Sequence, residues 1–116
     1  MCIRDSNITG GTNNQIIGGT GANLVTATSG TNTITGGSSN ADVFSLSGGV
    51  NTVFGGTGTD TIKVTGGSNA VTGGTGIDNI ALISGTTNVI GGAGSDQVVA
   101  LNGTNTICLL YTSRCV

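Results

Sequence analysis

Apolar residues along this chain follow a local alternation and a long repeat. Within short stretches every second residue is apolar, as in Ile62-Lys63-Val64. A period of two places successive side chains on opposite faces of a β-strand. Most of the apolar residues are small or β-branched, which favours strands, and the abundant glycine disfavours helices. The pattern therefore predicts an all-β protein built from short strands.

The alternation recurs with a period of 18 residues. The segment 55–72 (GGTGTDTIKVTGGSNAVT) is repeated in related form at 73–90 and 91–108, and weaker copies begin near residues 18 and 36. The copy at 36 has one extra residue in its first loop, and residues 7–17 resemble the end of a further copy. A fixed period over several copies indicates units that bury their apolar sides by stacking on one another.

Three apolar rows run through the copies. They are Val25, Phe44, Ile62, Ile80 and Val98; Ala27, Leu46, Val64, Leu82 and Ala100; and Ile34, Val53, Val71, Val89 and Ile107. We expect these rows to form the core of a right-handed parallel β-roll, a β-solenoid with about 18 residues per coil. Phe44 and Phe54 share the irregular copy, and we expect both to fill a locally wider core. Lys63 is expected to face outward.

The two ends of the chain do not follow the repeat. Residues 1–6 (MCIRDS) and 108–113 (CLLYTS) can be back-translated to a sequencing-library adapter and its reverse complement, and 114–116 to the start of another copy. We therefore predict that residues 1–6 and 108–116 are adapter-derived and that the β-roll domain comprises residues 7–107. All three cysteines and both arginines then lie outside the native segment, which removes the basis for a disulfide or a thiolate metal site.

The remaining composition argues against several classes of function. The segment 7–107 carries one cation, Lys63, and four aspartates, and the chain has neither histidine nor tryptophan. It offers no basic patch with aromatic residues for nucleic acid and no apolar run of about 18 residues for a membrane span. No histidine or native cysteine is present to activate a nucleophile. We expect no catalytic activity in this segment, although a parent protein could carry an enzyme domain elsewhere.

All four aspartates of the segment occupy the same position in successive copies, and they are Asp42, Asp60, Asp78 and Asp96. Stacked coils place such neighbours about 5 Å apart, where two like charges repel by roughly 3 kcal/mol at an effective dielectric constant of 20. A divalent cation between coils would turn this repulsion into attraction. Calcium suits the position because flexible loops can supply it with several oxygens. Zinc and iron suit it poorly without histidine or cysteine.

Glycine-rich turns precede three of these aspartates, and their backbone carbonyls are expected to complete the metal shell. The turns are Gly55, Gly56, Thr57 and Gly58; Gly73, Gly74, Thr75 and Gly76; and Gly91, Gly92, Ala93 and Gly94. In the copy at 18, Asn23 replaces the aspartate, and the loop before Asp42 lacks the fourth-position glycine. We therefore expect the metal sites between the coils of Asp60, Asp78 and Asp96.

The stretches GGTGTDTIK, GGTGIDNIA and GGAGSDQVV resemble the calcium-binding nonapeptide GGxGxDxUx, with U apolar, of the RTX (repeats-in-toxin, hemolysin-type) family. The resemblance implies a parallel β-roll with calcium between successive turns. It also implies a bacterial protein that is secreted, often by type I secretion, as a toxin, protease, lipase or adhesin.

One departure from this family changes the expected number of metal sites. Typical members repeat the motif every nine residues, whereas the second half of each unit here carries Asn32, Asn51, Asn69 or Asn105, with Thr87 replacing one. Stacked asparagines can hydrogen-bond to one another without metal. We therefore expect an asparagine ladder on one edge and calcium only on the other.

Three other interpretations remain open. Asp and Asn are common in solvated turns because they form local hydrogen bonds. A calcium-independent stalk of an adhesin or surface protein would use the same core and could extend by edge pairing between molecules. Regular threonines such as Thr31 and Thr33 also resemble the face of an ice-binding solenoid, although Val50, Ser68 and Ala70 interrupt the rows.

Overall fold

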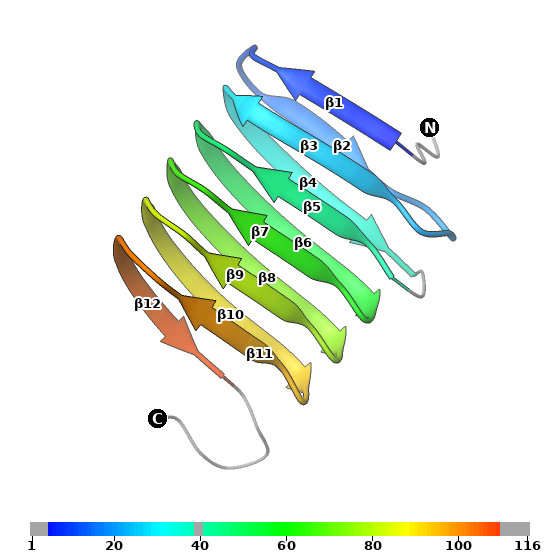
Figure 1. The fold of residues 1–116 in the computed structure, drawn as a ribbon. Coiled ribbons are helices and arrows are strands. Elements are labelled where there is room, and N and C mark those ends of the chain that lie inside the picture. The colour runs from blue at the N-terminus through cyan, green and yellow to red at the C-terminus, as the bar shows by residue number, and fades with distance from the viewer. Residues whose placement is uncertain (1–4, 39–40, 110–116) are drawn as a thin grey trace.

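The chain folds as a β-solenoid of stacked coils (Figure 1). The computed structural model describes residues 5–38 and 41–109, with side chains from residue 7 onward, and every regular element in these ranges is a β-strand. Two parallel six-stranded sheets face each other, and each coil contributes one strand to each sheet. The predicted all-β solenoid with coils about 18 residues apart is confirmed.

The odd-numbered strands form one sheet, called sheet A, and the even-numbered strands form sheet B. Sheet A contains β1 (Asp5–Thr9), β3 (Leu24–Ser29), β5 (Val43–Leu46), β7 (Thr61–Val64), β9 (Asn79–Leu82) and β11 (Gln97–Ala100). Sheet B contains β2 (Asn14–Ile17), β4 (Thr31–Gly37), β6 (Val50–Gly58), β8 (Ser68–Gly76), β10 (Thr86–Gly94) and β12 (Thr104–Cys108).

The register of the strands follows the repeat. Ile62 pairs with Ile80, and Val71 pairs with Val89, so equivalent residues of successive copies lie side by side. In the copy at 36, Phe44 pairs with both Val25 and Ile62. The extra residue of that copy is therefore absorbed before β5, as the apolar rows predicted.

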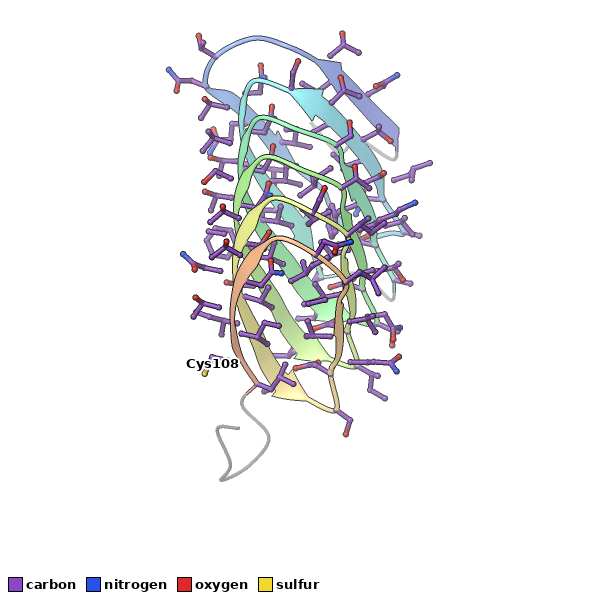
Figure 2. The ribbon with its side chains drawn as sticks, turned by 60° about the vertical axis from the view of Figure 1, so that its left-hand side comes forward. Cys108 is labelled. Carbon is purple, nitrogen blue, oxygen red and sulfur yellow. The ribbon has the colours of Figure 1, made fainter. Side chains whose placement is uncertain are left out.

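Most of the ends predicted to be adapter-derived, residues 1–4 and 110–116, lie outside the described residues. The backbone of residues 5 and 6 begins β1. Cys108, labelled in Figure 2, ends β12 and pairs with Ile90. Both strands thus run across the predicted boundaries of the domain at residues 7 and 107. The adapter origin of the ends stays a prediction.

The core lies between the two sheets and consists of the predicted rows. The buried apolar residues are Ile16, Val25, Ala27, Ile34, Phe44, Leu46, Val53, Ile62, Val64, Val71, Ile80, Leu82 and Val89. Val98 and Ile107 are only partly buried, and the expectation that Ala100 is a core residue is wrong because its side chain is exposed. β11 and β12 are the last described strands of their sheets, so no later described coil covers them.

Phe54 corrects a second expectation. Phe44 is fully buried, but Phe54 is 44% exposed on the outer face of sheet B, where it pairs with Thr35 and Thr72. The cause is the strict alternation of β6, in which Asn51 and Val53 point inward and the next residue must point outward. Lys63 lies on an exposed outward position of β7, as expected.

The glycine motifs differ from the expected turns. Gly55–Gly58 belong to β6, and Gly73–Gly76 and Gly91–Gly94 belong in the same way to β8 and β10. Gly56 and Gly58 have φ values of 114° and 119°, which residues with a side chain rarely adopt. These conformations let the strands of sheet B include the whole glycine motif. After β6, the chain bends between Gly58 and Thr61.

Asparagine side chains form the predicted ladder at the opposite edge of the coil, near the start of the sheet B strands. Each Nδ2 donates to the Oδ1 of the next coil, at 2.8 Å from Asn14 to Asn32, 2.7 Å from Asn32 to Asn51 and 2.7 Å from Asn51 to Asn69. Asn51 and Asn69 also donate to the carbonyls of Gly48 and Gly66 in their own turns. The ladder thus joins successive coils through neutral hydrogen bonds.

Thr87 interrupts this ladder. Its Oγ1 is buried, as is the Oδ1 of Asn105 in the next coil, and neither oxygen has a hydrogen-bond partner among the described residues. Register places Thr87 between Asn69 and Asn105. A threonine side chain is too short to bridge both neighbours as an asparagine does. The side-chain hydrogen bonds that would join position 87 to Asn69 and to Asn105 are therefore missing.

We predict that Thr87→Asn stabilises the folded chain by about 1–2 kcal/mol, because the new amide restores hydrogen bonds to Asn69 and Asn105. The free energy of unfolding in urea, measured at saturating calcium, checks this. Thr86→Asn, on the exposed face of the same strand, is the matched control and should change little. A Thr87→Asn chain no more stable than wild type would contradict the ladder as a source of stability.

Candidate metal centre

The four aspartates occupy the edge of the solenoid where each sheet B strand bends toward the next sheet A strand. Asp60 lies between β6 and β7, and Asp78 lies between β8 and β9. This edge is opposite the asparagine ladder, because the ladder residues sit near the start of the sheet B strands and the aspartates follow their ends (Figure 1). The predicted single row of carboxylates is therefore present.

The aspartate side chains point into the coil, not toward solvent. Asp42, Asp60 and Asp78 are fully buried, and only Asp96 in the last complete coil is half-buried. The interpretation of these residues as solvated turn residues is therefore wrong for the first three. A buried carboxylate is costly unless hydrogen bonds or a cation compensate it.

In each carboxylate, Oδ1 accepts a hydrogen bond from a backbone N–H of the preceding coil, and this bond holds the two coils in register. The backbone N–H of Asp42 donates to Oδ1 of Asp60 at 2.9 Å. The same bond joins Asp60 to Asp78 at 3.0 Å and Asp78 to Asp96 at 3.1 Å. The backbone carbonyls of the aspartates accept in turn from the next coil, as Asp60 does from the N–H of Asn79 at 2.8 Å. The row therefore fixes the stacking of this edge.

The first glycine of each motif makes room for the second carboxylate oxygen. A Cβ atom placed on Gly55 would lie 2.5 Å from Oδ2 of Asp60, and one on Gly73 would lie 2.5 Å from Oδ2 of Asp78. Gly91 bears the same relation to Asp96, at 2.6 Å. A Cβ atom on Gly55 would also lie 2.2 Å from the carbonyl oxygen of Gly73 in the next coil, and one on Gly73 would lie 2.3 Å from that of Gly91. Both the stacking of the coils and the space of the carboxylate therefore require glycine at the start of the motif.

The Oδ2 atoms of Asp60 and Asp78 are buried and have no hydrogen-bond partner in the described part of the chain. Burial raises the pKa of the Asp60 carboxyl to about 6; the hydrogen bond from Asp42 opposes this shift, and the charges of Asp78 and Asp42 add to it. Burial likewise raises the pKa of Asp78, against the hydrogen bond from Asp60 and with the charge of Asp96. Near neutral pH this edge thus holds charge that the protein itself leaves uncompensated.

Asn23 occupies the equivalent position in the copy at 18 and shows what the aspartates lack. A Cβ atom on Gly18 would lie 2.7 Å from Nδ2 of Asn23, so this nitrogen sits where the later coils place Oδ2. The nitrogen donates to the carbonyl of Gly21 at 2.7 Å and to Oδ1 of Asp42 at 2.9 Å. Asn23 thus places a hydrogen-bond donor, Nδ2, between two acceptor oxygens. Asp60 and Asp78 place another acceptor, Oδ2, at the equivalent position.

The chemistry of this edge fits a hard cation. All candidate donors are oxygens: carboxylates of the aspartate row and backbone carbonyls of the glycine motifs, such as that of Gly58. Among residues 7–38 and 41–109, no three His, Cys, Asp or Glu side chains converge on one point. Any one site therefore draws on few charged ligands and needs neutral oxygens from the backbone to complete its shell.

The other predicted site residues differ in their position relative to the carboxylates. Gly55, Gly73 and Gly91 touch the carboxylates, and Gly58, Gly76 and Gly94 lie two residues before them. The side chains of Thr57, Thr75 and Ala93 are exposed, so only their backbones can take part. Gly56, Gly74 and Gly92 pair with one another in the sheet B ladder. Whether these backbones bind metal stays a prediction.

Comparison with known proteins gives one match. A family model described as the RTX calcium-binding nonapeptide repeat, in four copies, matches residues 8–43, 45–80 and 84–108. The matched ranges cover most of the chain and include the irregular copies at 18 and 36. No curated protein and no solved structure matches the chain.

We predict that the metal-free fold is more stable in mild acid than at neutral pH. The folded pKa of Asp60 is about 6 and its ordinary value is 3.8, so the folded chain binds protons more tightly than the unfolded chain. The resulting stability is fully present below pH 3.8 and is lost as the pH rises through about 6. Circular dichroism in a chelator should therefore show more β-structure at about pH 4.5 than at about pH 7.5.

The double variant Asp60→Asn, Asp78→Asn is the control for this pH dependence, because it removes the two carboxyls whose pKa values are raised. Its β-sheet signal should change much less over the same range. A wild-type signal that is constant, or that grows toward neutral pH, would contradict the buried charge.

Proposed function

Because this chain belongs to the RTX calcium-binding nonapeptide repeat family, we propose that it is a calcium-binding β-roll segment in which ion binding drives folding and scaffolding. The observation that carries the proposal is the pair of buried Oδ2 atoms on Asp60 and Asp78 without a hydrogen-bond partner in the described ranges. A cation bound between the coils of Asp60, Asp78 and Asp96 would supply the missing positive charge.

In this proposal the chain's own residues have separate roles. The Oδ1 atoms keep the coils in register through backbone N–H groups, whether or not metal is bound. The Oδ2 atoms and nearby backbone carbonyls would hold the ion, and the leading glycines keep their space clear. Calcium suits this set better than magnesium, which demands near-ideal octahedral geometry and gives up its waters reluctantly.

Calcium is expected on one edge only. The opposite edge is joined by neutral amide hydrogen bonds from Asn14 to Asn69, which use both the donors and the acceptors of their side chains. Those groups carry no negative charge for a cation to neutralise. The asparagine ladder therefore supports the interpretation of that edge as metal-independent.

We also propose that the segment works outside the cell, as part of a secreted or surface protein. Each site would draw on two carboxylates at most, and a low ligand charge lowers calcium affinity toward the 10⁻⁴–10⁻³ M range of extracellular modules. Such a site would be empty during synthesis and would fill after export. No helix in the described ranges is long and apolar enough to cross a membrane.

Neither alternative function is favoured by a specific observation. The outer face of sheet B carries Val50, Phe54 and Ala70 among its threonines, so it lacks the regular rows that an ice-binding face needs. A calcium-independent stalk would leave the buried carboxylates without compensation. We propose no catalytic role for the segment, since the chain contains no histidine to serve as a base.

We predict that the chelated chain at neutral pH is largely disordered and gains β-structure cooperatively as calcium is added. The ion binds only the folded coils, so its binding free energy adds to the stability of the fold. Circular dichroism during a calcium titration tests this, with an equal concentration of magnesium as the control. Identical spectra and melting points with calcium and with chelator would leave the stalk as the better explanation.

We predict that Asp78→Asn weakens calcium-induced folding more than the same change at any other aspartate. Asp78 lies between Asp60 and Asp96, so its carboxylate can serve the sites on both sides. Asp42→Asn, the matched control, should matter least because its loop lacks the motif's fourth glycine. Calcium midpoints of the two variants compare them directly, and equal midpoints would contradict the assignment of ligands.

A further inference from the structure

The copy at 18 keeps the whole glycine motif but lacks its charge. Residues 18–23 read GGTGAN, so a single atom type separates this copy from the GGxGxD sequence of the metal-binding copies. Asn23 is nearly fully buried, at 5% exposure, as the aspartates of the next coils are. Its backbone N–H donates to Oδ1 of Asp42 at 2.8 Å, which is the register bond of the other coils.

The side-chain amide of Asn23 donates two hydrogen bonds. Its two amide protons go to the carbonyl of Gly21, at 2.7 Å, and to Oδ1 of Asp42, at 2.9 Å. These acceptors belong to the two coils that meet at this joint. The amide thus compensates two oxygens, as a cation would. Only one of the two residues at this joint, Asp42, is charged.

We infer that Asn23 makes the joint between the coils of β3 and β5 independent of metal, so that the calcium row does not extend to this joint. The inference depends on the proposed calcium function for the later joints. At the joint of Asp60 with Asp78, two carboxylates meet. The backbone N–H of Asp60 donates to Oδ1 of Asp78, but neither ionised side chain has a proton to donate, so the proposed ion has a role there. At the joint of Asn23 with Asp42, the ion has no role left.

A consequence is that the two parts of the solenoid differ in their response to calcium. The coils joined by Asn23 need no ion at their own joint, so calcium is required only for the stacking of later coils. The choice between Asn and Asp at this one position therefore determines both the number of ions bound and the stability of the metal-free chain.

The test is an exchange of the two residue types in the full chain. Asn23→Asp creates the complete motif GGTGAD with little change in shape, so it should bind one additional calcium ion. It should also lower the stability of the metal-free chain, because it removes two donated hydrogen bonds and adds a buried charge. Asp60→Asn should do the reverse, with one ion fewer and a more stable metal-free chain.

Two measurements report these effects separately. Equilibrium dialysis with calcium gives the number of ions per chain. The concentration of trimethylamine N-oxide, an osmolyte that favours compact states, needed to fold half of the metal-free chain gives its stability without calcium. Asn51→Asp, which places one carboxylate in the neutral ladder, is the matched control: it should raise the osmolyte midpoint and add no ion.

The outcomes separate this inference from the function on which it depends. A wild-type chain that binds no calcium would overturn the proposed function itself. A wild-type chain that binds calcium, together with an Asn23→Asp chain that gains no ion and keeps the wild-type osmolyte midpoint, would overturn the role of Asn23 alone. An additional ion together with a raised osmolyte midpoint for Asn23→Asp would establish it.

Discussion

The whole solenoid depends on a hydrogen bond that links each coil to the next through a side chain at its edge. Parallel strands hold their coils together along the two sheets, but the bends between sheets bring backbone and side-chain polar groups inside, where no water compensates them. At one edge this need is met by amides from Asn14 to Asn69. At the other edge it is met by carboxylates, whose Oδ1 atoms receive the N–H groups of the preceding coil.

The difference between an amide and a carboxylate then decides what each edge can do. An asparagine both donates and accepts, so a column of them closes upon itself and needs nothing else. An ionised aspartate only accepts, so a column of aspartates always leaves oxygens over. At Asp60 and Asp78 these oxygens are buried. The same stacking geometry therefore pairs the amides from Asn14 to Asn69 on one edge and leaves buried acceptor oxygens on the other, where we propose that an ion binds.

The sequence was sufficient to predict features that follow from periodicity. Alternation and the 18-residue repeat identified the buried rows, such as Ile62 with Ile80, and placed the aspartates and asparagines in two columns. Phe54 was misplaced because its size suggested burial, although the alternation of β6 points it outward. Ala100 was misplaced because a row continues in sequence even where no further described coil covers it.

Other features required atomic positions. The glycine motifs read as turns in sequence, yet positive φ values at Gly56 and Gly58 let them extend sheet B. Sequence alone also gave no reason to regard Asn23 as more than a degraded aspartate. Its role became visible only when Nδ2 proved to occupy the place of Oδ2 and to donate to both adjoining coils. The glycines of GGTGAN gave no separate signal, because a Cβ atom on Gly18 would lie 2.0 Å from the carbonyl oxygen of Gly36 whichever residue stands at position 23.

The most direct measurement is the anomalous diffraction of calcium in crystals grown with the ion. Because the buried Oδ2 atoms of Asp60 and Asp78 lack donors among the described residues, calcium peaks are expected inside the coil edge beside these two oxygens. No peak is expected beside Asn23 or along the asparagine ladder. Calcium peaks confined to the outer surface, with both oxygens still buried and without an ion, would contradict the claim that the aspartate row exists to bind metal.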